Sequence, residues 1–550
     1  MPPSLPASGP ALESEAGIWK KRTLWLLLGA AVLRLVYAAL VRIELAGDEA
    51  YYWDWGRRLD WGYYSKPPLI AWLMALIGWI GRNTDVAIRM APVVVITGSL
   101  WLLSRLTSRL FGERAGFVAS LTAMAFPANA LLGFFFTIDA PLIFFWTGSL
   151  ITFWDWTEGR HPVRSLLLLT LMLGLGHLSK QMMLIFPILA VIYLATTPAK
   201  RFLLRRPGFW LAVAGSLLFL VPSLVWNAHH DWITFQHTRH HFDAATVPFW
   251  QSFLEFLAYQ LGAVLSPLLW LLVMAIAALG TWRWKQLDDR ERFLWCFSAP
   301  ALLLMYVMAL RQTMLPNWAA VYYVAPCVWI GGWYAGKSNV LAAPGWRALW
   351  KPGISVGLVL MLSFFLLLPG IAWVGKAGDK QLDPASRVRG WREVGRQAGE
   401  FLAQVPRPEQ TVVIALGHRY NASELAFYMP GQPRVYRWHR FLEVESQYEL
   451  WPDPVAEGKK GWDALIFLDG RDTKLMYRFE TKFADLKRLG EIEVKPGPQM
   501  ERYYQVFLGR LTSWPKGAPP KQPGALPEEE DAPGTDTDPL PPTPATAPPP

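Results

Sequence analysis

The chain has 550 residues, of which 53% are hydrophobic and only 17% charged, and it contains 30 Trp and 29 Phe. This composition excludes an ordinary soluble globular protein. The formal net charge is +10, but Lys and Arg cluster in short loops between apolar runs, which indicates membrane topology and no nucleic-acid partner. The two cysteines, Cys296 and Cys327, lie in apolar stretches and do not indicate a disulfide framework.

The N-terminal segment and the segment after it differ in polarity. Residues 1–22 are rich in Pro, Ser and Ala and end in Lys20-Lys21-Arg22, so we predict a disordered N-terminus that its basic cluster keeps in the cytoplasm. Residues 23–41 form an apolar run long enough to cross a bilayer. The chain should therefore reach the far side of the membrane near residue 44.

Two adjacent acids, Asp48 and Glu49, stand where the chain leaves this first span. Charges at a membrane boundary are costly to keep without a function, so we place a candidate site in the first outside segment, residues 44–83. Aromatic residues follow, including Tyr63 and Tyr64, whose rings suit either a sugar or an interfacial aromatic belt. A belt alone would have no need for the two acids.

Lys66 stands directly before two prolines. A residue before proline is pushed out of helical geometry, so the lysine should sit in an extended turn. A lysine fixed at the headgroup level suits a phosphate, although snorkelling to anionic lipids would place it there equally well. The apolar stretch 68–81 that follows is short for a span, which predicts an interfacial helix.

Two more charged residues reach the same side when the apolar runs are counted between basic cytoplasmic loops. Asp139 begins the fourth predicted span, where the helix dipole alone would also favour an acid. Lys180 interrupts an apolar stretch that is better divided into two spans meeting at an outside turn. Altogether the apolar runs predict about eleven spans, or up to about 13.

Two later outside segments carry further candidates. Residues 227–250 hold five of the nine histidines, among them His229 and His230. A diagnostic metal-ligand spacing is missing there, so a solvated or acceptor-lining loop is favoured over a metal site. Arg311 and Asn317 lie in the second segment. No cofactor is firmly predicted, the metal ligands are unknown, and a role for a divalent metal is left open.

Residues 376–510 have the composition of a small soluble α/β domain, which span counting places outside the cytoplasm. The periodicity predicts one helix and three buried strands, at 391–403, 411–416, 464–468 and 503–508. Residues 511–550 are rich in Pro with an acidic patch, so we predict a disordered tail.

The order of these charged motifs resembles that of the C-type membrane glycosyltransferases. The similarity is to the bacterial branch related to protein O-mannosyltransferases and to the lipid A aminoarabinose transferases, and it covers residues 20–375. Four short motifs carry it: Asp48-Glu49, Tyr63-Tyr64-Ser65-Lys66-Pro67-Pro68-Leu69, Thr137-Ile138-Asp139-Ala140-Pro141-Leu142 and Leu178-Ser179-Lys180-Gln181.

This resemblance implies an α-helical polytopic membrane protein of the C-type glycosyltransferase architecture. Residues 23–375 would form the transmembrane domain, with 44–83 as a catalytic loop, and 376–510 a small extracytoplasmic α/β domain. It also implies inverting transfer of a sugar from a polyprenyl-phosphate donor to lipid A, another lipid, a glycan or a protein, on the outer side of the bacterial inner membrane. The alternative is a transporter or flippase of lipid-linked glycans, whose charges should lie nearer mid-bilayer.

The resemblance further implies roles for the charged residues. Asp48 matches the first family acid and would orient or deprotonate the acceptor, and Asp139 matches the second and would bind the acceptor or hold Lys66. Lys66 would neutralise the departing phosphate, with Lys180 and Arg311 as helpers. The supporting or acceptor-lining candidates are Glu49, Tyr63, Tyr64, His229, His230 and Asn317.

Overall fold

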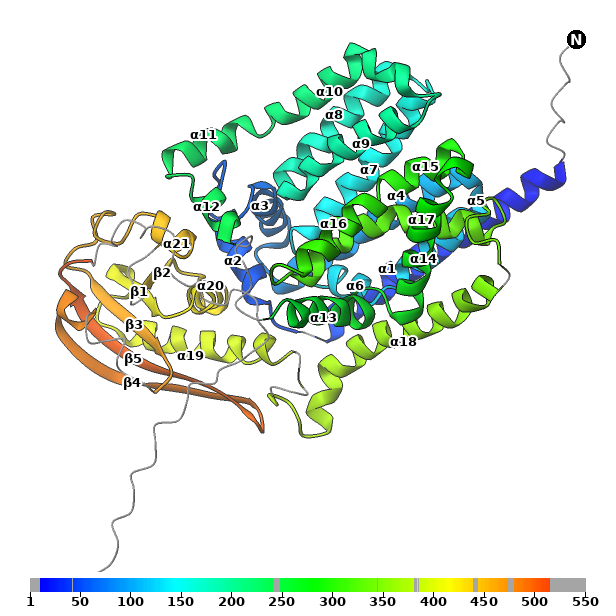
Figure 1. The fold of residues 1–550 in the computed structure, drawn as a ribbon. Helices are drawn as coiled ribbons and strands as arrows, with labels where there is room; N and C mark the ends of the chain where they lie inside the picture. The colour runs from blue at the N-terminus through cyan, green and yellow to red at the C-terminus, as the bar shows by residue number, and fades with distance from the viewer. Residues whose placement is uncertain are drawn as a thin grey trace, which may run out of the picture.

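The computed structural model describes residues 10–514 apart from 42, 241–247, 344, 380–382, 384, 439–443 and 472–478. It consists of a large helical part and a smaller sheet domain that follows it in the chain (Figure 1). The predicted disorder of residues 1–9 and 515–550 lies outside the described residues. The helix α1 (Pro10–Leu40) begins well before the first span, so the disorder predicted for residues 10–22 is wrong.

Six helical segments in the described chain are long and apolar enough to cross a membrane, and a bent pair would make a seventh. The protein is therefore a multi-pass membrane protein, while the predicted count of about eleven spans stays a prediction. The six segments are α1, α4 (Asp85–Phe111), α8 (Pro162–Ser179), α10 with α11 (Pro207–Leu218, Val221–His229), α15 with α16 (Asp289–Cys296, Ala299–Ala309) and α18 (Gly345–Trp373).

The bent pair consists of α13 (Phe249–Tyr259) with the π-turn Gln260–Val264, and α14 (Pro267–Trp282). The two halves meet at 113°. Ser266 adopts a φ of 85°, which is outside the helical region, and it precedes Pro267, a position at which helical geometry is disfavoured. A stretch that the apolar pattern reads as continuous is thus broken at one dipeptide.

Other helices fill the space between these segments and make the core. They include α5 (Glu113–Met124), α7 (Asp139–Thr157) and α17 (Val324–Tyr334). Large side chains such as Trp146 and Trp329 are fully buried among them. At Gly331 a Cβ would lie 2.6 Å from the carbonyl oxygen of Ala115, so glycine is what lets α17 and α5 pack this closely.

The segment after α1 contains α2 (Gly47–Gly56) and α3 (Leu69–Gly81). The helix expected over residues 68–81 is therefore confirmed. Both helices lie on the side of the helical part that faces the sheet domain (Figure 1). The charged motif that opens the predicted site is consequently placed at the joint between the two parts of the molecule.

The sheet domain has a five-stranded sheet with strand order β2-β1-β3-β5-β4. The first three strands of that order are parallel, and β5 and β4 continue the sheet antiparallel. The predicted helix and three strands are confirmed, whereas β2, β4 and the helix α20 escaped prediction. The elements are α19 (Trp391–Gln404), β1 (Thr411–Leu416), α20 (Arg419–Tyr428), β2 (Val435–Trp438), α21 (Gln447–Leu450), β3 (Asp463–Asp469), β4 (Phe483–Gly497) and β5 (Met500–Leu511).

The parallel strands β1, β2 and β3 are buried on both faces, as their apolar sequences require, whereas β4 at the other edge is largely exposed. On β1, Val413 and Ala415 join the core shared with the helical part, while Val412 and Ile414 belong to a second core on the opposite face. The sheet domain is thereby packed against the helical part through a continuous apolar core.

Candidate active site

The two opening acids occupy the first turn of α2, where the helix dipole favours negative charge. Their environments differ. Glu49 is fully buried, and its Oε2 accepts from the backbone N–H of Ala46 at 2.9 Å, which caps the helix. Asp48 is only partly buried. Adjacent positions in one helical turn thus point one carboxylate into the core and the other toward the outer surface of α2.

Glu49 forms a buried ion pair with Arg89 of α4, with an Nη1–Oε2 distance of 2.5 Å. The backbone N–H of Phe136 donates to Oε1 of Glu49 at 2.8 Å, and Arg89 donates to the carbonyl of Phe134 at 3.2 Å. The network ties α2 to α4 and to the segment that leads into α7. Glu49 is therefore a structural support, and Arg89 is a partner that sequence reasoning missed, although an arginine in the first turns of an apolar span was a usable signal.

Asp48 receives one hydrogen bond, from the phenol of Tyr420 in the sheet domain to Oδ1 at 2.9 Å. No cation pairs with its carboxylate in the part of the chain that the structure describes. Sequence reasoning missed Tyr420 because it lies 372 positions away. Asp48 is thus an accessible carboxylate held by a neutral donor.

Asp139 begins α7 and is buried with 3% of its surface exposed. The ammonium of Lys180 donates to its Oδ1 at 2.8 Å, and the amide of Asn317 donates to its Oδ2 at 2.7 Å. Three predicted site residues from separate segments therefore meet. Lys66 makes no bond to Asp139 among the described contacts, and the Asp139 carboxylate neutralises Lys180 instead.

The turn that carries Lys66 is fixed by its neighbours. Tyr63 is fully buried, stacks on Trp55 at 4.5 Å and donates to the carbonyl of Arg58 at 3.1 Å, so it supports the turn rather than lining a binding surface. The backbone N–H of Tyr64 donates to the side chain of Gln447 at 2.7 Å. Lys66 itself is partly buried, and no hydrogen bond or ion pair reaches it from any described residue.

Gln447 of the sheet domain links this turn to α2, because its backbone N–H donates to the phenol of Tyr51 at 2.5 Å. On the other side, Thr234 of α12 (Ile233–His240) donates to the carbonyl of Tyr63 at 2.8 Å. The lysine turn and α2 are thus neighbours in space. Among the described contacts no direct bond joins Asp48, Lys66 and Asp139 to one another.

The predicted histidines lie beside this turn. His230 stacks on Trp226 at 3.9 Å, and the indole of Trp226 donates to Asp60 at 2.7 Å. His229 is exposed, and its Nδ1 donates to the carbonyl of Val225 at 2.8 Å. Within the described ranges no three His, Cys, Asp or Glu side chains are grouped to hold a metal ion.

Arg311 follows α16 and is exposed, and its side chain makes no hydrogen bond or ion pair with any described residue. Six positions further along the chain Asn317 reaches Asp139, so this segment passes close to the start of α7. Arg311 is therefore a second cation without an ion-pair partner among the described residues, unlike the neutralised Lys180.

A narrow, mostly apolar cavity of about 70 Å³ lies within the helical part. Ile143 and Thr147 of α7 line it, one and two turns beyond Asp139 in the same helix. Tyr323 and Cys327 line it from the segment that follows Asn317. The cavity is thus lined by residues that follow Asp139 and its partner Asn317 in the chain, and it offers an apolar group a place close to the polar site.

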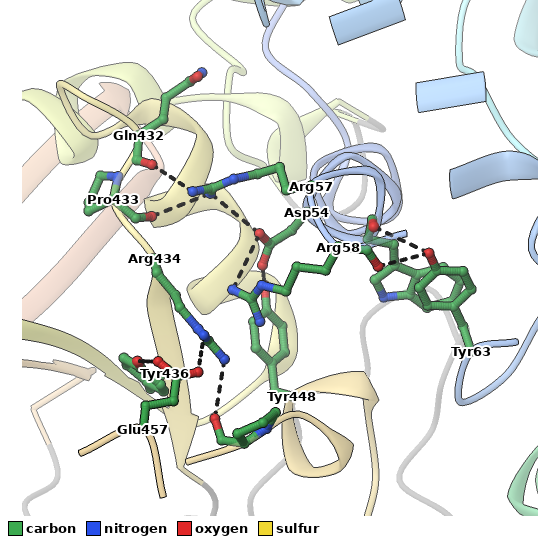
Figure 2. A network of polar contacts seen from close by, with 12 residues as sticks. Asp54, Arg57, Arg58, Tyr63, Gln432, Pro433, Arg434, Tyr436, Tyr448 and Glu457 are labelled. Atoms are coloured by element: carbon green, nitrogen blue, oxygen red, sulfur yellow. Dashed lines mark hydrogen bonds and ion pairs between the residues drawn. The ribbon is translucent and has the colours of Figure 1, made fainter. Parts of the chain in front are cut away.

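Figure 2 shows how the C-terminal half of α2 is fixed to the sheet domain. The phenol of Tyr448 donates to Asp54 at 2.8 Å, and Arg57 donates to the carbonyl of Gln432 at 2.9 Å. Burial, and after it the Asp54 carboxylate, raises the pKa of Tyr448, so this phenol remains a neutral donor. α2 is therefore held at several points by the C-terminal domain.

Comparisons with known proteins identify relatives of the chain. The model of the dolichyl-phosphate-mannose-protein mannosyltransferase family matches residues 65–226. Lipid A galacturonosyltransferase RgtD of Rhizobium johnstonii is 30% identical over 435 residues, which cover 78% of this chain and 86% of the relative.

Solved structures of ArnT from Cupriavidus metallidurans share the fold. The apo form has a TM-score of 0.58 at 16% identity and covers 88% of this chain and 98% of its own. The form bound to undecaprenyl phosphate has a TM-score of 0.56 at 16% identity and covers 88% and 97%. Together with the match to the galacturonosyltransferase, these findings show that the chain belongs to the C-type membrane glycosyltransferases, as an enzyme of the polyprenyl-phosphate-sugar-dependent kind.

Proposed function

We propose that this enzyme transfers a sugar from a polyprenyl-phosphate donor to an acceptor hydroxyl outside the bacterial inner membrane, with inversion at the anomeric carbon. The observation that carries the assignment of roles is a contrast in charge compensation. Asp48 and Lys66 bear charges that no opposite charge neutralises among the described residues, whereas Lys180 and Asp139 neutralise each other. Uncompensated charges of both signs suit a reaction that moves a proton and releases an anion.

In this mechanism the Asp48 carboxylate takes the proton of the acceptor hydroxyl. The hydroxyl oxygen attacks the anomeric carbon from the face opposite the phosphate, and the carbon–oxygen bond to that phosphate breaks. The polyprenyl phosphate leaves with the bonding electron pair and carries one more negative charge than it had in the donor. Lys66 neutralises this charge, and the exposed guanidinium of Arg311 is its proposed helper.

Asp139, Lys180 and Asn317 act as a framework in this proposal. Their mutual bonds fix the start of α7, the turn after α8 and the segment after Arg311 against one another. Asp139 consequently shapes the site and does not exchange a proton. The apolar cavity beyond Asp139 is proposed to receive the first isoprene units of the donor, because its lining is apolar and begins one turn from the polar groups.

The relative's name supplies the first substrate pair to test. We propose a galacturonic acid donor on polyprenyl phosphate and lipid A as acceptor, because the matched relative is a lipid A galacturonosyltransferase. Other polyprenyl-phosphate sugars, and glycan or protein acceptors, are the comparison arms of the same assay.

The test uses the purified protein in lipid nanodiscs with each donor and acceptor. Mass spectrometry should show lipid A gaining one uronic acid residue, and NMR of the product should show the inverted anomeric configuration. Release of polyprenyl phosphate must match product formation, which separates transfer from the flippase alternative. Arg488→Gln, on an exposed position of β4, provides a folded control. Transfer from a nucleotide sugar without the lipid donor would contradict the proposal.

A further inference from the structure

We propose that the C-terminal domain completes the active site, with Tyr420 as a positioning residue that holds Asp48 and with Arg419 behind it. This inference rests on the proposed function, because it concerns the carboxylate to which that function gives the proton. It assigns the sheet domain a part in the reaction itself. The observations that carry it are the face that α20 presents, the close approach at Gly47 and a chain of donors that ends on Asp48.

α20 turns one face toward the chain between α1 and α2. Tyr420, Glu424 and Tyr428 are four residues apart and therefore line one side of the helix. The phenol of Tyr428 accepts from the backbone N–H of Leu45 at 2.7 Å, and the phenol of Tyr420 donates to Asp48 at 2.9 Å. The same face thus contacts the backbone before α2 and the carboxylate in its first turn.

Gly47 permits this contact. A Cβ at position 47 would lie only 2.3 Å from Cγ of the Tyr420 ring. Any side chain there would push the ring away from its place over the helix start. The glycine and the tyrosine are far apart in the chain but sterically matched, and the match places the phenol oxygen beside the neighbouring Asp48.

The guanidinium of Arg419 contacts the phenol of Tyr420. Nη2 of Arg419 donates to the Tyr420 oxygen at 3.3 Å, and the guanidinium carbon lies 4.9 Å from the centroid of the same ring. Arg419 is 8% exposed and also lies 5.6 Å from the centroid of Tyr51. A hydroxyl that accepts from a cation becomes a stronger donor. The charge of the guanidinium therefore acts on Asp48 through the phenol while leaving the carboxylate open to an acceptor.

The docking of the two parts does not depend on this hydroxyl. Tyr51 of α2 accepts a bond of its own from the sheet domain. Asp54 of α2 and its cap residue Arg57 make further bonds to that domain (Figure 2). Phe427 packs against Trp53 at 4.9 Å in addition. Removing one phenol oxygen at Tyr420 should therefore leave the fold and the joint intact, which makes its effect on catalysis measurable.

The test compares Tyr420→Phe with Tyr428→Phe in steady-state transfer and in thermal melting. Tyr420→Phe should lower kcat about ten-fold, the effect of one hydrogen bond in the transition state, with little change in KM for the donor. Tyr428→Phe removes a phenol from the same face, so it should lower the melting temperature and leave kcat near wild type. Gly47→Ala displaces the ring from the other side and should reproduce the kcat loss of Tyr420→Phe.

A double-mutant cycle identifies positioning as the cause. If Tyr420 acts through Asp48, Tyr420→Phe should not lower the rate any further in an Asp48→Asn background. If Tyr420→Phe merely reduced the amount of folded enzyme, the double variant would show the product of the two single fold-decreases. Wild-type kcat in both Tyr420→Phe and Gly47→Ala, with Asp48→Asn inactive, would overturn this inference alone. Full transfer by Asp48→Asn would instead overturn the proposed role of Asp48.

Discussion

The two acids that mark the predicted site, Asp48 and Asp139, are held in opposite ways. Asp139 is buried and takes a charged donor on one oxygen and an amide on the other. Asp48 is partly open and takes a single neutral phenol, which comes from another domain. A buried carboxylate must be paired or protonated to be tolerated, whereas a carboxylate without a counter-charge takes up a proton more readily. On this difference we propose a structural role for Asp139 and a catalytic role for Asp48.

The sharpest way to break this comparison is to neutralise each acid in turn. Asp48→Asn keeps the shape but removes the base, so transfer should fall about 10²- to 10⁴-fold, with the melting temperature close to wild type. Asp139→Asn should lower the melting temperature, unlike Asp48→Asn, because it leaves the buried Lys180 without a counter-charge. Initial rates and thermal melts of both variants measure this. Equal losses of stability would contradict the division of roles.

Lys180→Met tests the framework from the cationic side. Removing one partner of a buried pair leaves the other charge uncompensated, at a cost of about 3–5 kcal/mol. The double variant Asp139→Asn with Lys180→Met removes both charges and should recover part of that loss. Denaturation of the three variants in the same detergent gives the comparison. A stable but inactive Lys180→Met would instead place this lysine at the donor phosphate.

Lys66→Met should lower the rate of transfer but not the stability, whereas Lys180→Met should lower the stability. Lys66 has no bonded partner in the described chain, so its loss should leave stability unchanged. Losing one group that stabilises the departing phosphate should lower kcat about 10²- to 10³-fold, and Lys66→Arg should restore part of the rate because it keeps the charge. Single-turnover rates with the lipid-linked donor measure the step directly. An unchanged rate would remove Lys66 from the mechanism.

Sequence patterns predicted this site unevenly, for physical reasons. Charges at membrane boundaries are rare enough to stand out, so Asp48, Lys66, Asp139 and Lys180 could be placed on one side by counting spans. Their pairing was not readable, because a chain of apolar runs does not say which helix ends meet. The order of the charged residues along the chain therefore could not show that Lys180 forms an ion pair with Asp139.

The contacts between the helical part and the sheet domain could not be predicted from the sequence, for a different reason. Tyr420 and Gln447 belong to a domain whose strands could be predicted from their apolar runs, but tyrosine and glutamine in short helices carry no signal of a distant partner. Conversely, Tyr63 looked like a sugar-binding ring and is a buried support that stacks on Trp55. Aromatic composition alone does not separate a binding surface from a core.

Glu424 offers a third kind of carboxylate and the smallest expected effect. It lies between Tyr420 and Tyr428 on α20, is fully buried, and neither of its oxygens finds a donor among the described residues. Burial, opposed by Arg502 and reinforced by Glu44 and Glu49, raises its pKa well above the ordinary 4.5. The folded state therefore keeps a proton that the unfolded chain releases. Stability contributed by this group should fall as the pH rises above about 4.5.

Glu424→Gln stays neutral at every pH, so it should melt higher than wild type near pH 8, and the difference should shrink toward about pH 4.5. Each unit by which burial raises the pKa is worth about 1.4 kcal/mol at neutral pH. Glu409→Gln, at an exposed position of the same domain, should show no such pH dependence. A Glu424→Gln variant that melts lower than wild type at pH 8 would mean that the carboxylate is ionised in the joint. The joint would then hold two carboxylates, Asp48 and an ionised Glu424. The described contacts provide no cation paired with either carboxylate, so the open state of Asp48 would no longer distinguish it as the reacting group.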